Sequence, residues 1–378
     1  MSVISVVGAG PVGLHCAALM REEGFDVSVF EEHAVVGKPV QCAGLISKSG
    51  AQSLGLKLSD CVVNEIKGAK IFSPGAECIA VERKETTALV IDRFQFDQLF
   101  YKKAKQAGCD IHLGSKLIDL RSNNLFLESL GHGEMQKSMI IVGADGPNSI
   151  VRNSVFGQGF EKNFVQGYQI RANGSFDKNF VELHFGEFAP GFFAWVIPES
   201  GSAARIGLGV RLGENPAECL RKFMQQKNLQ VKKLSETAGL IPVAPPAKQL
   251  VAGNVLLVGD AAFQTKASTG GGIIFGLQAA QICAATIANK LKHQQSLKTY
   301  EKNLSELNKE LGIHWKIYSF IQSMQPNQMD ALFRKAKSAG IERFLQQYGD
   351  MDKPSTFLRK ILFKPSMWSL LPAALKMI

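Results

Sequence analysis

A strand–helix–strand pattern at the start of this 378-residue chain constrains its fold more than any other feature. An apolar strand over residues 3–7 runs into a glycine-rich turn, and a helical pattern (14–23) and a second strand (26–30) follow. The second strand ends at Glu31, about 20 positions after the turn. A βαβ unit with an acidic residue at this distance is typical of a site that binds a dinucleotide.

The turn has the pattern Gly-x-Gly-x-x-Gly, formed by Gly8, Gly10 and Gly13. We expect Gly8 to allow the tight turn, Gly10 to let the backbone approach a pyrophosphate, and Gly13 to let the helix pack close to the strand. The pyrophosphate would lie at the helix N-terminus, where free N–H groups favour an anion. A carboxylate at Glu31 binds ribose hydroxyls but repels a 2′-phosphate, so NADP is disfavoured and NAD and FAD remain.

Two later apolar strands end in short motifs with a carboxylate. One begins at residue 140 and ends at Asp145-Gly146; the other begins at residue 254 and ends at Gly259-Asp260. Together with the N-terminal unit, and in the same order, they resemble the flavoprotein hydroxylase and reductase superfamily. The resemblance implies FAD rather than NAD. It also implies that Asp260 holds the ribityl or ribose part of FAD and that the next helix N-terminus faces the flavin.

Two more segments resemble the geranylgeranyl reductases, flavoenzymes that saturate isoprenoid chains. Residues 39–47 contain Cys42-Ala43-Gly44, which looks like the Cys-x-Gly element of that family, and residues 190–198 resemble its aromatic-x-Trp-x-x-Pro motif. The resemblance covers roughly residues 1–290. The chain departs from it at Ala267-Ser268, where the family often has a proline, and this leaves open the geometry of a loop that lies near the flavin in relatives.

The resemblance implies a set of site residues. The catalytic candidates are Cys42 and Gly44, with Cys42 shaping the site or relaying a proton, and the substrate-binding candidates are Phe193, Trp195 and Pro198. No metal site is expected. Cys42 as a mere packing residue and Arg93 as an ordinary surface arginine at a helix start remain alternatives. The cofactor-binding candidates are Gly8, Gly10, Pro11, Val12, Gly13, Glu31, Glu32, Cys42, Ala43, Arg93, Asp145, Gly146, Gly259, Asp260, Gly271, Gly272 and Ile273.

The expected architecture is α/β and β, with a Rossmann-like FAD-binding domain, an antiparallel-sheet substrate domain of the p-hydroxybenzoate hydroxylase kind, and a helical C-terminal region. We expect Asp92 to be the N-cap of a helix. The FAD-binding domain is expected to be discontinuous (1–72, 88–160 and 245–290). The substrate domain would combine residues 161–244 with 66–88, and the basic helical region would span 291–378.

Within the substrate sheet, alternation along residues 192–197 would turn Phe193, Trp195 and Ile197 to one face and Phe192, Ala194 and Val196 to the other. The sheet would wall a ligand cavity over the flavin. The alternative is that these aromatic side chains only fill the core of the sheet. The apolar stretch 270–288 contains adjacent glycines and two glutamines, so we interpret it as a buried helix rather than a membrane span.

Charge and cysteine content limit the partners. Seven cysteines without a close pair favour a reducing cytosol and argue against a disulfide framework or a zinc site. From residue 290 onward there are 15 Lys and Arg and 7 Asp and Glu, and these basic residues alternate with large apolar ones. This pattern favours an anionic membrane surface over nucleic acid; the alternative is a basic helix packed on the FAD domain.

The sequence therefore predicts a cytoplasmic, peripheral-membrane, FAD-dependent reductase that saturates isoprenoid lipid chains with an external electron donor, either NAD(P)H, ferredoxin or another. One alternative is an FAD-dependent aromatic or polyketide monooxygenase, that is, a hydroxylase. The other is an electron-transfer flavoprotein dehydrogenase or a non-catalytic FAD binder.

Overall fold

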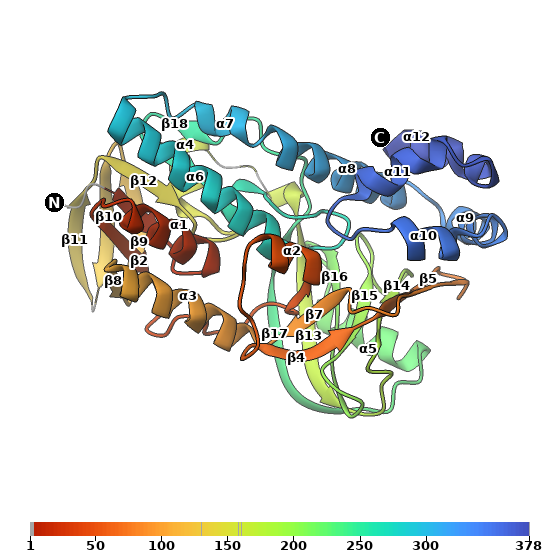
Figure 1. Ribbon diagram of the computed structural model, residues 1–378. Helices are drawn as coiled ribbons and strands as arrows, with labels where there is room; N and C mark the ends of the chain where they lie inside the picture. The colour runs from red at the N-terminus through yellow and green to blue at the C-terminus, as the bar shows by residue number, and fades with distance from the viewer. Residues whose placement is uncertain (1–3, 130, 158, 160, 378) are drawn as a thin grey trace.

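The computed structural model describes residues 4–129, 131–157, 159 and 161–377. A six-stranded sheet forms the part on the left of Figure 1. Neighbouring strands pair in parallel except for the last two along one edge, β19 and β18. The strand order is β8 (Asp110–Leu113), β2 (Val27–Glu31), β1 (Ile4–Val7), β12 (Ile140–Gly143), β19 (Val255–Leu257) and β18 (Val251–Ala252). The strands expected from the three sequence motifs thus lie side by side, with their carboxyl ends at one edge of the sheet.

Helices cover this sheet. Helix α1 (Pro11–Glu22) begins directly after the glycine turn and packs against α3 (Arg93–Ala107) and α6 (Ile273–His293). The N-cap prediction for α3 is confirmed, because the Asp92 side chain accepts a hydrogen bond from the Gln95 amide. A shorter helix, α4 (Ile150–Phe156), follows the Asp145-Gly146 strand end.

Helix α6 confirms the buried helix expected over residues 270–288. Its apolar side chains, among them Leu277, Cys283 and Ile287, are buried in the same core as those of α1. Within the described residues, no helix is long and apolar enough to cross a membrane.

A seven-stranded sheet lies to the lower right of the first in Figure 1. All its pairs are antiparallel except β14 with β5. Helix α5 (Pro216–Gln226) covers one face and buries Leu220 and Phe223 against it. The strand order is β17 (Lys232–Pro242), β13 (Phe164–Asn173), β16 (Ala203–Arg211), β15 (Ala194–Pro198), β14 (Phe180–His184), β5 (Gly68–Phe72) and β6 (Cys78–Glu82). Residues 68–82 therefore join the strands of 164–242; the domain limits stay a prediction.

Two three-stranded sheets complete the β-structure. One has the order β3 (Leu45–Ser47), β7 (Ala88–Ile91) and β4 (Val62–Ile66), and the other β11 (His132–Lys137), β10 (Asn124–Ser129) and β9 (Ser115–Arg121). The short elements between the larger ones are α2 (Lys48–Ser53), η1 (Glu161–Asn163) and the turn η2 (Gly259–Ala262).

The C-terminal region is helical, as expected, and in Figure 1 it runs from α7 at the upper left, above α6, to α12 at the upper right. Its elements are α7 (Thr299–Asn303), α8 (Ser305–Gln322), α9 (Pro326–Ser338), α10 (Ile341–Tyr348), α11 (Pro354–Leu362), η3 (Pro365–Leu370) and α12 (Leu371–Met377). The apolar faces of α9 to α12 form a core that includes Phe344, Leu358 and Ile361 and also Ile79 of β6, so these helices pack on the end of the seven-stranded sheet. Helix α7 packs instead against α6, and its Tyr300 is buried in the core of the six-stranded sheet. The alternative of a basic helix packed on the FAD domain stays a prediction.

Candidate functional site

A cavity of about 1380 Å³ joins the two large sheets. One end is lined by the carboxyl ends of β1, β2 and β12, by η2 and by the N-terminus of α6; the other is lined by β5, β14 and β15 and by residues of α10 and α11. The cavity therefore connects the expected nucleotide site with the expected substrate sheet. The expected cofactor-binding residues that line it are Gly8, Gly10, Pro11, Val12, Glu31, Glu32, Cys42, Ala43, Arg93, Asp145, Gly146, Gly259, Asp260, Gly271, Gly272 and Ile273.

The glycine turn forms one wall. Gly8 has φ +100°, and a Cβ there would overlap the carbonyl oxygen of Ala144. A Cβ on Gly10 would meet no protein atom within 4 Å, so this backbone is open to the cavity. Gly13 does not line the cavity, and a Cβ there would overlap the carbonyl oxygen of Gly8, so its role as a cofactor contact stays a prediction. It acts by allowing α1 to pack close to β1.

Glu31 ends β2 with its carboxylate turned toward this turn. Its Oε2 accepts a hydrogen bond from the Ala9 amide at 2.8 Å, and its Oε1 accepts one from the His33 amide at 3.0 Å. Glu32 also lines the cavity and lies 3.5 Å from the Lys116 ammonium. Two carboxylates therefore stand at the position expected for a ribose.

Asp145 lines the cavity, but its carboxylate is engaged by helix α4. It accepts hydrogen bonds from Ser149 Oγ at 2.5 Å and from the Val151 amide at 3.0 Å. Burial raises the pKa of Asp145. The role of this residue at the site is thus to shape the loop between β12 and α4.

Asp260, on η2, is placed differently. Its Oδ1 accepts a hydrogen bond from Thr265 Oγ1 at 2.9 Å, and in the described part of the chain its Oδ2 has no hydrogen-bond partner. Burial raises the pKa of Asp260. A Cβ on Gly272 would lie 2.7 Å from Asp260 Oδ1, so the start of α6 lies directly against this carboxylate. Asp260 therefore offers an acceptor to a ligand hydroxyl at the N-terminus of α6.

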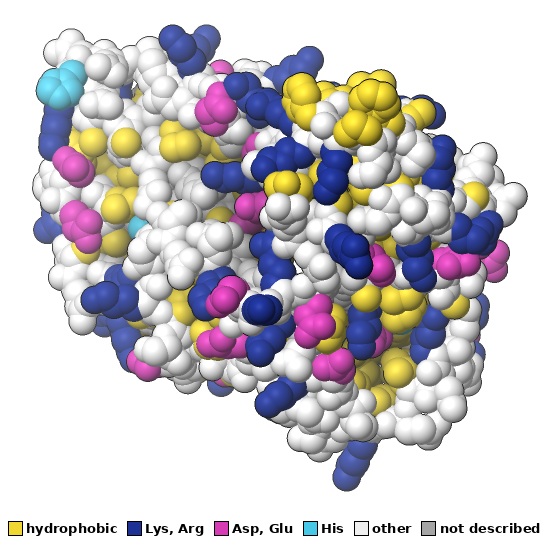
Figure 2. Space-filling model, turned by 45° about the vertical axis from the view of Figure 1, so that its right-hand side comes forward, with side chains coloured by type: hydrophobic (Ala, Val, Ile, Leu, Met, Phe, Trp, Pro, Cys, Tyr) yellow, Lys and Arg dark blue, Asp and Glu magenta, His cyan; other side chains and the backbone are white. Residues whose placement is uncertain are grey.

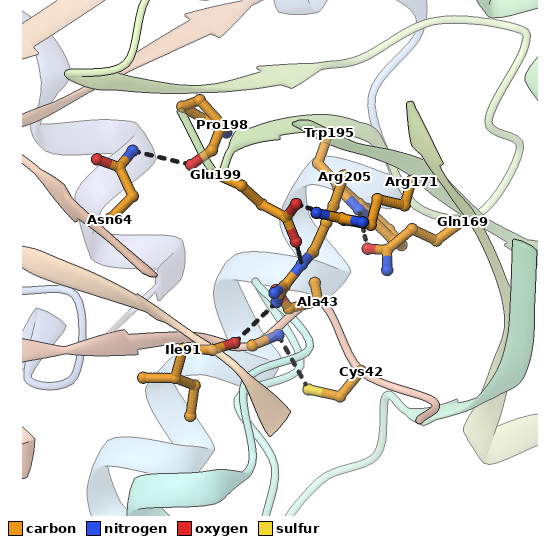
Figure 3. Close-up of polar contacts among 11 residues, drawn as sticks. Cys42, Ala43, Asn64, Ile91, Gln169, Arg171, Trp195, Pro198, Glu199 and Arg205 are labelled. Carbon is orange, nitrogen blue, oxygen red and sulfur yellow. Dashed lines mark hydrogen bonds and ion pairs between the residues drawn. The ribbon is translucent and has the colours of Figure 1, made fainter. Parts of the chain in front are cut away.

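The loop that carries Cys42 is held by Arg205 of β16 (Figure 3). The Arg205 guanidinium donates hydrogen bonds to the carbonyl oxygens of Ala43 (2.6 Å) and Ile91 (3.0 Å), and to Glu199 Oε1 (2.8 Å). Arg205 is only 9% exposed. The substrate sheet is thus fixed to the Cys42 loop by a buried arginine that sequence reasoning missed, because its partners are backbone atoms far away in the chain.

Cys42 and Gly44 both line the cavity. The Gly44 amide donates to Cys42 Sγ at 3.3 Å (Figure 3), and Gly44 has φ +66°. Arg93 lies beside Cys42 and is paired with Asp97 at 3.0 Å. Burial acts to lower the pKa of Arg93, and neighbouring Cys42 and Asp97 outweigh it, so this pKa lies above its ordinary value. Arg93 therefore keeps its charge at the cavity wall.

Strand β15 presents Trp195 and Ile197 to the cavity, as the alternation predicts. The same alternation turns Pro198 away from the cavity, and its role in substrate binding stays a prediction. Phe193 lines the cavity, but so does Phe192, which was expected on the opposite face. Both phenylalanines precede the strand, where alternation does not apply, and their rings stack 4.2 Å apart.

A buried polar cluster beside the α6 N-terminus was not predicted. The Lys266 ammonium lies 2.6 Å from Asp352 Oδ1, and His314 Nδ1 lies 2.6 Å from Ser268 Oγ. Lys266, Ser268 and His314 line the cavity. The only sequence signal was a lysine next to the Ala267-Ser268 departure; its partners come from the C-terminal region, which the family resemblance did not cover.

Comparison with known proteins bears on these features. Residues 164–241 match the family model for the geranylgeranyl reductase catalytic domain, residues 6–43 that for an NAD(P)-binding Rossmann-like domain, and residues 214–371 that for lycopene cyclase protein. Over 366 residues the chain is 28% identical to the digeranylgeranylglycerophospholipid reductase of Methanothrix thermoacetophila, covering 90% of this chain and 92% of the relative. Over most of its length the chain is therefore similar to digeranylgeranylglycerophospholipid reductases.

Solved structures show that this fold is shared with flavin-dependent enzymes. A geranylgeranyl bacteriochlorophyll reductase-like protein from Thermoplasma acidophilum has a TM-score of 0.85 at 20% identity, covering 100% of this chain and 99% of that one. A flavin-dependent brominase has a TM-score of 0.71 at 14% identity, covering 96% and 98%. The expected fold class is thereby confirmed.

Proposed function

We propose that this chain is an FAD-dependent reductase that saturates the double bonds of geranylgeranyl chains in lipid biosynthesis, with a digeranylgeranylglycerophospholipid as its substrate. The observation that carries the proposal is the single cavity with a nucleotide turn at one end and an apolar wall at the other. The near full-length similarity to a digeranylgeranylglycerophospholipid reductase supports the choice of substrate.

The residues at the nucleotide end fit FAD. The open backbone of Gly10 has room for a pyrophosphate, Glu31 stands where a ribose would bind, and the free oxygen of buried Asp260 suits a ribityl or ribose hydroxyl. When bound, FAD supplies the hydride. Glu31→Ala should weaken FAD binding by about 1–3 kcal/mol in a fluorescence titration. Glu128→Ala, at an exposed position that does not line the cavity, is the matched control and should leave FAD binding unchanged.

The other end of the cavity fits an isoprenoid chain. It is lined by apolar side chains from both sheets and from the C-terminal helices: Ile66, Ala69, Ile71, Val81, Val181, Leu183, Phe192, Phe193, Trp195, Ile197, Ile317, Leu345, Met351, Pro354 and Phe357. An isolated alkene has no carbonyl to stabilise a carbanion, so the protein must hold it in place, exclude water and supply a proton. Cys42, at the junction of the two ends, is placed to shape the site or to relay that proton.

A membrane-bound substrate requires a docking surface. A C20 chain gains on the order of 16 kcal/mol on leaving water, and passage from a bilayer into an apolar cavity nearly cancels that term. Three exposed side chains of the C-terminal region, Phe363, Trp368 and Leu375 (84%, 56% and 60% exposed), form what we call the C-terminal apolar patch. Figure 2 shows hydrophobic side chains over these helices with Lys and Arg around them. This arrangement supports peripheral binding to an anionic leaflet, which the proposal places on the cytoplasmic side.

The test is anaerobic incubation with digeranylgeranylglycerophospholipid and dithionite, which replaces the unidentified electron donor. We expect each reduced double bond to add two hydrogens to the lipid, measured by mass spectrometry. Heat-denatured protein with free FAD is the control. Oxygen insertion into an aromatic compound in air with NAD(P)H would instead establish the hydroxylase alternative, and electron transfer to an iron–sulfur protein without lipid turnover would establish the dehydrogenase.

A further inference from the structure

Lys266 is a buried lysine that faces the cavity. It is 4% exposed, and its ammonium donates to Asp352 Oδ1 at 2.6 Å and to the Met351 carbonyl oxygen at 3.3 Å. An ammonium has three N–H groups, and in the part of the chain that the structure describes the third has no acceptor. Lys266 lines the cavity and Asp352 does not, so the positive end of the pair is on the cavity side.

The lysine lies against the N-terminus of α6. Its backbone amide donates to the Gly271 carbonyl oxygen at 3.1 Å, and a Cβ on Gly271 would lie 2.8 Å from Lys266 Cε and 3.3 Å from its Nζ. The first turn of a helix carries free N–H groups and the positive end of the helix dipole. Two sources of positive potential therefore act on the same part of the cavity.

The surroundings fix the position of the ammonium. Ser47 Oγ donates to Asp352 Oδ2. Burial acts to raise the pKa of Asp352, and the nearby Lys266 charge outweighs it, so the pKa lies below its ordinary value. Because the Asp352 carbonyl oxygen can only accept, His314 Nε2 donates to it (3.3 Å), and Nδ1 then accepts from Ser268 Oγ (2.6 Å).

His314 adds no charge to the cluster. Burial, and secondarily the Lys266 charge, lower its pKa to about 3, so the imidazole is neutral near pH 7. Lys266 is thus the cation of this cluster, and Asp352, Ser47 and His314 position it.

We propose that Lys266 binds the flavin and favours its negatively charged reduced state over the neutral oxidised state. This rests on the proposed function, which places a flavin in the cavity. An external two-electron donor delivers two electrons and one proton to the bound flavin, and the product keeps one negative charge. A fixed cation on the cavity wall lowers the free energy of that charged state in a site with little water. Reduced flavin therefore binds more tightly than oxidised flavin, and the midpoint potential is raised.

The experiment measures the midpoint potential of the bound flavin in Lys266→Met and in Lys266→Met/Asp352→Asn. The double variant removes the ammonium without leaving a buried carboxylate unpaired. We expect the preference for reduced flavin to fall about tenfold in the double variant, which is a fall of about 30 mV for a two-electron couple. Lys222→Met, which removes an exposed cation that does not line the cavity, should leave the potential unchanged.

A second variant, for which the midpoint potential should rise instead of fall, keeps the test valid if the first variants misfold. Asp352→Asn keeps the ammonium and removes its counter-charge, so the potential should rise. An unchanged potential in both Asp352→Asn and the double variant, with flavin bound, overturns the role of Lys266. Wild-type protein that binds no flavin overturns the proposed function instead, so the two failures are distinguishable.

Discussion

Gly44 is held by two contacts that leave no room for a side chain. Its φ is +66°, and a Cβ would overlap both Arg205 Nη1 and the Ile91 carbonyl oxygen. Gly55 has nearly the same φ, +62°, but a Cβ there would meet no atom within 4 Å. Substitution of Gly55 therefore measures the strain of a left-handed backbone alone, whereas substitution of Gly44 adds the clash with the arginine.

We predict that Gly55→Ala costs about 1–2 kcal/mol of unfolding free energy and that Gly44→Ala costs about 3 kcal/mol or more. The additional loss arises because the Arg205 hydrogen bonds must move. Urea unfolding of the two variants measures the difference. Equal losses in both variants would mean that the Arg205 contact does not hold the loop.

Cys42 can be tested at the same scale. We predict that Cys42→Ser leaves FAD bound, because it exchanges one small polar side chain for another, and reduces alkene turnover, because the residue lines the cavity. Cys78→Ser is the matched variant, since this half-buried cysteine does not line the cavity. Turnover and the flavin absorbance spectrum are measured together. Wild-type turnover in Cys42→Ser would return the residue to a packing role.

At the scale of single elements, α8 brings His314 into the buried cluster. In the folded protein the pKa of His314 is about 3, below its ordinary value of 6.5, so folding favours the neutral imidazole. The stability it contributes is therefore complete above about pH 6.5 and is lost as the pH falls from there toward 3. The loss can reach about 1.4 kcal/mol per pH unit for one proton.

We predict that His314→Gln makes the decline in unfolding free energy between pH 6.5 and 3 shallower than in the wild type. The exposed His293 is the matched position, and His293→Gln should leave the slope unchanged. Urea unfolding at a series of pH values gives both slopes. A wild-type slope in His314→Gln would show that the imidazole is not held neutral by burial.

The secondary-structure elements differ in how well the sequence predicts them. The βαβ unit, the Asp92 cap and α6 follow from local patterns, and the structure confirms them. The motif could not show that Pro198 turns away from the cavity, because a motif gives residue types but not the direction of each side chain. Lys266 and Asp352 could not be paired from sequence, because they meet only when the C-terminal helices pack. Long-range contacts of this kind carry no periodic signal.

At the scale of the whole molecule, the C-terminal region has two faces. Leu358, Ile361 and Met367 are buried in its core, whereas the C-terminal apolar patch is exposed. Deleting residues after Lys353 would therefore remove core residues, and replacing the exposed side chains is the cleaner test of membrane binding.

We predict that serine at all three patch positions (Phe363, Trp368 and Leu375) lowers binding to anionic vesicles by about tenfold or more, because apolar burial and charge act together. The flavin spectrum should be retained, since these side chains are exposed. Ile118, Met135 and Met139 are comparably exposed elsewhere, and serine at those three positions is the control. Vesicle co-sedimentation at low and high salt measures both. Equal binding by the two triple variants would contradict the assignment of this face.

The order of the six-stranded sheet has a consequence for the newly made chain. Strand β12 lies between β1, made at the start of synthesis, and β19, made more than a hundred residues later. Until residues 255–257 leave the ribosome, the open edge of β12 can pair with another nascent strand. The N-terminal βαβ unit is thus complete as a cofactor site only after most of the chain has been synthesised. Under the proposed function, the nascent chain therefore binds flavin only after translation has passed α6, and a chain that stops earlier exposes this strand edge to chaperones.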